Sequence, residues 1–179
     1  MWGIGICLAG LAVIAAIQIV RVNQQYPQVE VVNIDKGQTA QLISGIDMQV
    51  VSAQWNSKEE AAQLYGEDFS QAMEEDCNYR TVAVTVELSN TTSEEINVSL
   101  YNIYLENNIY CNGLAPEVFF RIGNNQAMDI SIASNEKQEV MLGYVVYELQ
   151  FTKAQWNNMP DSTFYLADER YPIKRRWEI

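Results

Sequence analysis

The sequence predicts a mainly β protein, a β-sandwich with a short helical insertion that is preceded by one N-terminal transmembrane helix. Three observations predict it. Residues 2–20 carry no charged side chain, the rest of the chain reads as short strands between turn residues, and a helix-capping pattern interrupts the strands at Ser57. We therefore divide the chain into an anchor (residues 2–20), a linker (21–28) and a sandwich domain (29–179).

The anchor reads WGIGICLAGLAVIAAIQIV, and Gln18 is its only strongly polar side chain. At about 1.5 Å per residue, a helix of this length spans roughly 28 Å, close to the hydrocarbon thickness of a bilayer. The alternatives are a buried core helix and a cleaved signal peptide. The run is longer than the apolar region of a signal peptide and lacks a small-x-small cleavage site at its end. We expect an uncleaved single span that binds the membrane.

Few residues near the span indicate on which side of the membrane the domain lies. Arg21 is the only basic residue near the span, and taken alone it favours a cytoplasmic domain. A single residue is a weak basis for that rule, and we expect the domain outside the cytoplasm. The polar stretch before Pro27 is expected to act as a short tether, because proline discourages continuation of the helix.

Alternating apolar residues and turn signals predict the strands. The clearest is Tyr79–Asn90, in which Val82, Val84, Val86 and Leu88 share one face. Short strands at this spacing predict a β-sandwich of immunoglobulin-like type. The predicted strands are Val29–Asn33, Thr39–Ile43, Ile46–Trp55, Tyr79–Asn90, Ile96–Leu105, Val118–Ile122, Met128–Ile132, Gln138–Tyr147, Thr163–Ala167 and Ile173–Ile179.

Two helical segments interrupt the strands. Ser57 and Glu60 form a capping-box pattern that predicts a helix from Ser57 to about Tyr65, ended by Gly66. A second short helical turn is expected at Thr152–Asn158.

This organisation resembles that of small membrane-anchored proteins of Gram-positive bacteria with an immunoglobulin-like domain of unknown function. The resemblance rests on the N-terminal span, on Tyr26-Pro27, and on three C-terminal runs: Trp156-Asn157-Asn158, Phe164-Tyr165-Leu166 and Tyr171-Pro172-Ile173-Lys174. It implies an extracytoplasmic sandwich and supplies no catalytic residue.

Charge and composition exclude several functions. The chain has 11 basic and 23 acidic residues, a net charge of −12, which disfavours binding to nucleic acids. It contains no histidine. The Ser-His-Asp and Cys-His arrangements and most zinc and haem sites are thereby excluded. We expect a protein that is not an enzyme and has no cofactor.

The domain contains two cysteines, Cys77 and Cys111, each beside a predicted strand. They are a candidate disulfide of an exported domain, and two unpaired thiols are the equal alternative.

Two further groups of residues have both a structural and a functional interpretation. Acidic residues between positions 59 and 76 either form a solvated surface or supply oxygen ligands to calcium: Glu59, Glu60, Glu67, Asp68, Glu74, Glu75 and Asp76. Aromatic residues form either the core or a face that stacks on a ligand or partner: Trp55, Tyr101, Tyr104, Tyr110, Tyr144, Tyr147, Trp156, Tyr165, Tyr171 and Trp177.

The sequence thus favours a membrane-anchored extracytoplasmic domain for protein–protein contact, accessory to a membrane complex. The alternative is a sensor or binding module for a small ligand, either a cell-wall sugar or a cation.

Overall fold

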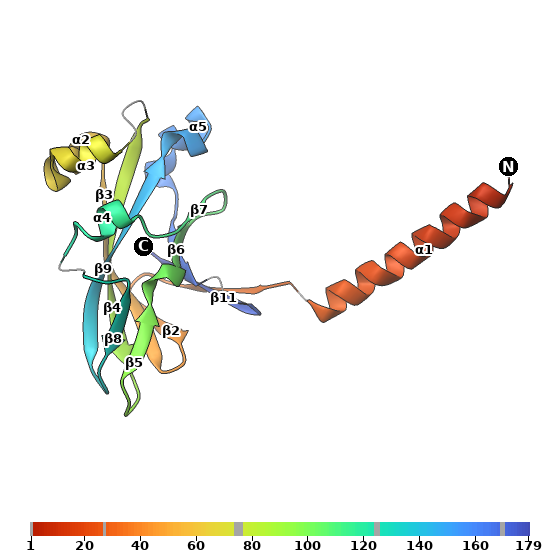
Figure 1. Cartoon of the computed structure of the whole chain (residues 1–179), viewed down its shortest axis with the longest axis horizontal. Coiled ribbons are helices and arrows are strands. Elements are labelled where there is room, and N and C mark those ends of the chain that lie inside the picture. The colour runs from red at the N-terminus through yellow and green to blue at the C-terminus, as the bar shows by residue number, and fades with distance from the viewer. Residues whose placement is uncertain (1, 27, 74–76, 124–125, 169–170) are drawn as a thin grey trace.

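The computed structural model describes residues 2–26, 28–73, 77–123, 126–168 and 171–179. Within them, helix α1 (Trp2–Gln25) is followed by a mainly β body with several sheets and a few short helices. Figure 1 shows α1 extending away from this body, which the chain enters through strand β1 (Glu30–Ile34). The predicted mainly β class is confirmed.

Helix α1 is longer than the predicted anchor. It includes residues 21–25, which we assigned to the linker and which contain neither proline nor glycine. Tyr26 N still donates to Val22 O at 2.8 Å. In the part of the chain that is described, no helix combines the length and the apolar character needed to cross a membrane. The span at residues 2–20 stays a prediction.

The first of the large sheets, sheet A, has the strand order β1-β11-β10-β6-β7. Strand β1 runs parallel to β11, with Glu30 opposite Ile173 and Ile34 opposite Trp177. The other neighbouring strands are antiparallel. The remaining bounds are β6 (Ile103–Glu106), β7 (Cys111–Asn112), β10 (Tyr165–Asp168) and β11 (Ile173–Glu178).

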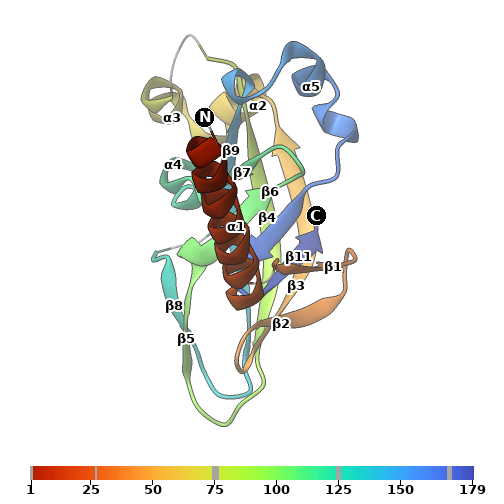
Figure 2. The ribbon, with the colours of Figure 1, turned by 90° about the vertical axis from the view of Figure 1, so that its right-hand side faces the viewer.

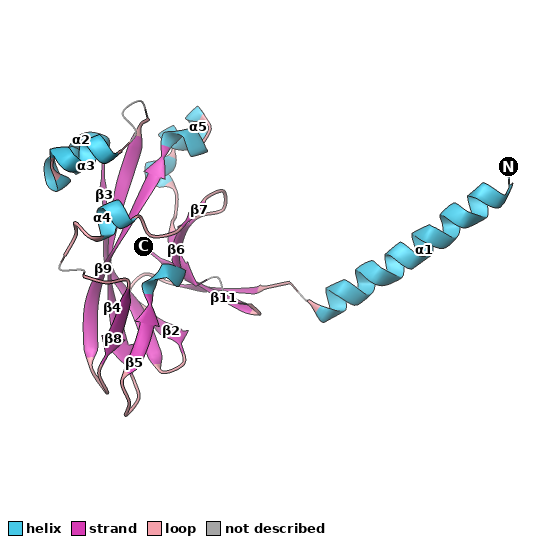
Figure 3. Cartoon of the chain, in the orientation of Figure 1, coloured by secondary structure: helices cyan, strands magenta, loops and turns pink. Residues whose placement is uncertain are grey.

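Sheet B is antiparallel throughout and has the order β2-β3-β4-β9. A separate pair of strands, β5 and β8, lies beside it at one end of the body (Figures 2 and 3). The bounds are β2 (Thr39–Ile43), β3 (Ile46–Asn56), β4 (Tyr79–Asn90), β5 (Ile96–Ser99), β8 (Asp129–Ile132) and β9 (Lys137–Tyr147).

The main core lies between sheets A and B. Val82, Val84, Val86 and Leu88 of β4 are all buried in it, as their alternation predicted. Burial of each such side chain contributes about 1.5–3 kcal/mol. Trp177 of β11 lies in the same core, and its indole N–H donates to Met48 O of β3 at 3.1 Å. The immunoglobulin-like assignment of this arrangement stays a prediction.

The prediction of one continuous strand at Ile96–Leu105 is wrong. A 3₁₀ turn at Leu100–Asn102 divides it into β5, which pairs with β8, and β6, which pairs with β10 and β7. Leu100 is fully buried in the core. The turn lets the chain leave the β5–β8 pair and enter sheet A, which a straight strand could not do.

The prediction of a strand at Val118–Ile122 is also wrong. The chain forms helix α4 (Pro116–Phe119), because Pro116 stands in the first turn, where its missing N–H costs nothing. Val118 and Phe119 are buried against β9. Their apolar character fits either element, and the local start signal decides in favour of the helix.

The two predicted helical segments are confirmed. Helix α2 (Lys58–Tyr65) has the capping box: Ser57 N donates to the Glu60 carboxylate at 2.7 Å, and Glu60 N to Ser57 Oγ at 3.2 Å. Gly66 follows it with φ 86°. Helix α5 (Lys153–Asn157) is capped by Thr152 in the same way. Helix α3 (Glu67–Ala72) and the 3₁₀ turns Glu148–Gln150 and Met159–Asp161 were not predicted separately.

Candidate functional site

The outer face of sheet B is covered over part of its length by α2, α3 and α4, which lie near one another in Figure 1. Their apolar side chains pack against β4 and β9. The helices and strands together form a second buried cluster: Ala61, Phe69, Met73, Tyr79, Ala83, Val118, Ile122 and Val145. Beyond α4 the sheet surface is hollowed into a groove of about 620 Å³. We call this hollow the sheet B groove.

The sheet B groove has polar and apolar lining. Its polar side chains come from β4, from β8 and β9, and from the segment before β8: Thr85, Gln126, Ser131, Gln138 and Glu139. Ala127, Ile130 and Met141 supply apolar surface. Thr85 and Met141 stand directly opposite each other on paired strands. A groove of this size is within the range of small-ligand sites.

Glycines in β9 and after α4 shape one end of the groove. Gly143 lies so close to α4 that a Cβ there would come within 2.7 Å of Phe119 N. Ala115 N donates to Gly143 O at 2.9 Å and fixes α4 on the strand. Gly123 (φ 57°) then turns the chain beside Met141. The sequence signal that we did not use is Gly143 itself, because a glycine inside a strand marks close approach of another segment.

The opposite wall, β8, is held by Asn90 at the end of β4, by β5 and by the 3₁₀ turn after β5. The side-chain amide of Asn90 donates to Ile132 O at 2.9 Å and to Glu94 O at 2.7 Å. Leu100 N donates to Met128 O at 2.8 Å, just before β8 begins. Ser131 Oγ is hydrogen-bonded to Asn97 Oδ1 on the paired strand β5. Hydrogen bonds from Asn90, Leu100 and Ser131 thus position this wall.

The lining of the groove carries little charge. Glu139 is the only charged side chain among the lining residues, all of which are described. Ser131 Oγ is hydrogen-bonded to the amide oxygen of Asn97. Among the residues that the structure describes, no group of three potential metal ligands is gathered anywhere. What the lining offers is hydrogen-bond donors and acceptors beside apolar surface.

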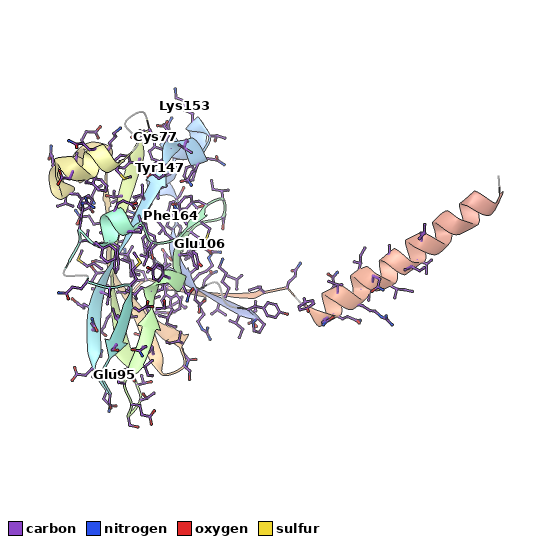
Figure 4. The ribbon with its side chains drawn as sticks, viewed as in Figure 1. Cys77, Glu95, Glu106, Tyr147, Lys153 and Phe164 are labelled. Atoms are coloured by element: carbon purple, nitrogen blue, oxygen red, sulfur yellow. The ribbon has the colours of Figure 1, made fainter. Side chains whose placement is uncertain are left out.

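A second candidate region lies on sheet A, on the side from which α1 extends; Figure 4 shows Glu106 there. The nearly buried Glu106 carboxylate pairs with Lys174 and, at 3.1 Å, with Arg176 Nε. The Arg176 guanidinium also lies 4.0 Å from the centre of the Tyr165 ring. Next to them, the buried Asp168 accepts from Arg175 N at 2.7 Å. The C-terminal basic run is therefore part of the sheet and is paired with acids.

Strand β1 forms the edge of sheet A beside this cluster. Four of its five residues are exposed, including Val31 and Val32. Glu30 N donates to Pro172 O at 3.0 Å, which ties the start of β1 to the start of β11. One side of β1 is bonded to β11 and the other forms the border of the sheet. Such an edge with exposed valines is a template for pairing with another chain.

Most of the candidate aromatic residues belong to the core or are partly covered, and only Tyr101 and Tyr171 are largely exposed. Tyr110 donates its hydroxyl to Val145 O at 2.9 Å, and Tyr144 donates to Ile103 O at 3.1 Å. Burial is the main cause that raises the pKa of Tyr110 and of Tyr144 above the ordinary tyrosine value. These two hydroxyls link the sheets and are not exposed to ligands.

The two candidate disulfide residues lie in different surroundings. Cys77 is buried just before β4, with its Sγ 3.7 Å from Asn78 O, whereas Cys111 is exposed on β7 at the far edge of sheet A. The structure does not join Cys77 to Cys111 by a bridge. The pairing stays a prediction.

The acidic stretch is distributed over two helices. Glu59 and Glu60 lie in the first turn of α2, where carboxylates are favourable, and Asp68 lies on α3. The pKa of Glu59 is lowered by a backbone hydrogen bond and by Ser57. The side chain of Glu67 and residues Glu74, Glu75 and Asp76 lie outside the described part. The described acids thus act as helix-capping and surface residues.

Comparison with known proteins identifies one family. The sequence model of the "Domain of unknown function (DUF5028)" family matches residues 23–175. No curated protein matches the chain. Among solved structures, "a functionally unknown protein from Listeria monocytogenes EGD-e" is similar at a TM-score of 0.46 and 11% identity, over 74% of this chain and 73% of that one.

Proposed function

We propose that this chain, which belongs to the DUF5028 family of unknown function, is a non-enzymatic domain that helix α1 holds at a membrane and that contacts another protein. We place the domain outside the cytoplasm and propose that its sheets form an immunoglobulin-like sandwich. The parallel pairing of the first and last strands of the body and the antiparallel order of sheet B support that assignment.

The apolar surface of α1 carries the proposal. Within residues 2–20, its described large apolar side chains are 50–64% exposed: Leu11, Val13, Ile14, Ile17, Ile19 and Val20. At about 100° of rotation per residue, they lie on all sides of the helix. A helix that is apolar all round is stable only in an apolar environment. Because residues 2–20 also lack any charge, lipid is the environment that we propose.

Membrane insertion is tested by fractionating cells that express the full chain. We expect it in the membrane pellet after an alkaline carbonate wash. Ile14→Arg places a charge at the middle of the span, which disfavours insertion by about 2.5–3.5 kcal/mol and shifts protein to the supernatant. The matched variant Val22→Arg, outside the span, should remain in the pellet. Unaltered chain in the supernatant would contradict the proposal.

The side of the membrane is tested separately by protease treatment of intact cells. An extracytoplasmic domain is cleaved without cell lysis, and a cytoplasmic one is protected until lysis. Protection in intact cells would overturn the proposed location while leaving the anchor itself unaffected.

The edge of β1 is the proposed protein-binding surface, because it exposes valines next to the point where the chain leaves α1. Strand addition at such an edge is a common mode of peptide recognition. Val31 on β1 and Val51 on β3 are both 48% exposed, so Val51→Asp is a matched control for Val31→Asp.

The test is cross-linking in intact membranes followed by affinity purification of the full chain. We expect a reproducible partner that Val31→Asp loses and Val51→Asp retains. Retention by both variants would contradict the role of β1, and the absence of any partner for the unaltered chain would contradict the function.

A second function, binding of a small ligand, is favoured by one observation, the sheet B groove with its polar lining. Ligand-dependent increases in the unfolding temperature of the full chain test it. An increase that disappears on substitution of groove residues would support this function.

A further inference from the structure

We infer that the sheet B groove recognises a neutral, hydroxyl-rich ligand of the class of short glycans. The inference rests on the second function proposed above and names its ligand class. Three features of the groove carry it: unused hydrogen-bonding groups, the sign of its charge, and apolar surface between the polar groups.

The hydrogen-bonding groups are of the kind that neighbouring hydroxyls match. The Gln126 and Gln138 amides each offer a donor and an acceptor, and the Thr85 hydroxyl offers both as well. None of these three side chains is hydrogen-bonded to another described residue. Among the described residues, no partner competes with a ligand for these three side chains. Strand β9 is the last strand of sheet B in this part of the chain, so one edge of its backbone also lies outside the sheet ladder.

The charge in the groove disfavours anionic ligands. Glu139 is the one charged lining residue, and it stands opposite Glu87 on the neighbouring strand. Lys137, which precedes Gln138 on β9, is paired with Glu87 at 2.7 Å. A phosphate or carboxylate entering here would meet like charge without a compensating cation. A carboxylate accepts hydrogen bonds from sugar hydroxyls without such a penalty.

The apolar part of the lining fits the remainder of such a ligand. Ile130 and Met141 present aliphatic surface between the polar groups, and Ala127 adds a small one. Sugar rings and their acetamido methyl groups carry C–H faces that bury well against such side chains. This alternation of amide, hydroxyl and aliphatic groups in the lining fits a glycan better than it fits a purely apolar ligand.

The test is a titration of the detergent-solubilised full chain with triacetylchitotriose, a neutral trisaccharide, followed by calorimetry. We expect saturable binding in the millimolar range or tighter. Gln138→Leu and Gln126→Leu should each weaken it about 5- to 10-fold, the effect of one lost hydrogen bond. Gln63→Leu, an exposed change on α2, is the matched control and should leave the affinity unchanged.

Inositol hexakisphosphate serves as the anionic comparison and should bind at least 10-fold more weakly than the trisaccharide. If the anion binds and the glutamine variants abolish that binding, the groove is a ligand site and only the ligand class is overturned. Trisaccharide binding that both glutamine variants leave unchanged overturns the inference, because the ligand then occupies another place. Lack of binding by either probe, in a chain whose unfolding temperature is normal, overturns both the inference and the second function.

Discussion

Trp177 connects the two large sheets through a single side chain. It is fully buried, and its indole N–H donates to Met48 O on the facing sheet. Trp177→Phe keeps an aromatic ring but removes this hydrogen bond and leaves a small void. We expect it to lower the free energy of unfolding by about 1–3 kcal/mol.

Guanidinium denaturation of the full chain measures this loss. The exposed Tyr101→Phe serves as the control and should change stability by less than about 0.5 kcal/mol. An equal effect of the two substitutions would contradict the role assigned to Trp177.

Buried tyrosines predict the alkaline limit of stability. In the folded chain the pKa values of Tyr110 and Tyr144 lie above the ordinary value, whereas in the unfolded chain they return to it. Above a pH of about 10 the unfolded state loses these protons and the folded state keeps them, so stability falls as pH rises. Below that pH both tyrosines are protonated in the folded and the unfolded state, and their contribution to the free energy of unfolding is fully present. Each tyrosine contributes a slope of up to about 1.4 kcal/mol per pH unit.

Urea unfolding between pH 8 and pH 11.5 measures the slope. Tyr144→Phe should lower stability at pH 8 by about 1 kcal/mol, because the bond to Ile103 O is lost, and should also flatten the alkaline slope. A slope unchanged by this substitution would show that other groups cause the decline. The chain contains no histidine that would titrate near neutral pH.

At the scale of elements, the contact between α4 and β9 depends on Gly143. A Cβ at this position would overlap Phe119 N and the Val118 side chain. We expect Gly143→Ala to cost about 1–3 kcal/mol, the usual penalty for overpacking. Gly113→Ala is the matched control, because nothing lies within 4 Å of a Cβ there.

Thermal unfolding of the two alanine variants gives the comparison. The Gly143→Ala chain should also lose amide protection in residues 116–122, because α4 no longer seats on the strand. Equal unfolding temperatures for the two variants would show that α4 can shift without cost.

Elements with strong local signals were predictable. The alternation in Tyr79–Asn90 and the capping box at Ser57 each fix one element, and both were predicted correctly. The segments Ile96–Leu105 and Val118–Ile122 were not, because an apolar run fits a strand, a turn or a buried helix equally well. In these segments the tertiary contacts determine which element forms: the contact with β8 for the first segment and the contact with β9 for the second.

At the scale of the whole molecule, the body should be stable without α1. Among the described residues, none before Ile34 belongs to the two apolar clusters of the core. Figure 1 shows the helix extending away from the body. We expect a chain that begins at Tyr26 to unfold within about 2 °C of the full chain in the same detergent, since a difference below about 0.5 kcal/mol shifts the midpoint by no more than that. A much lower midpoint would show that α1 packs on the body.

Long-range features were beyond the reach of the sequence. The pairing of β1 with β11 joins opposite ends of the body, and periodicity carries no information on which strands are neighbours. The sheet B groove likewise combines Thr85 with Gln126 and Glu139, which local patterns leave unrelated. The polar character of each residue was visible, but its position beside the others follows only from the fold.

The parallel pairing of β1 and β11 has a mechanical consequence. The two strands are joined side by side from Glu30–Ile173 to Ile34–Trp177, and the chain enters at one end of this pair and terminates near the other. Tension between the N-terminus and the C-terminus would load these backbone bonds in shear, so that they share the force and must rupture together. In a hairpin pulled from its open end, the inter-strand hydrogen bonds would instead break one after another.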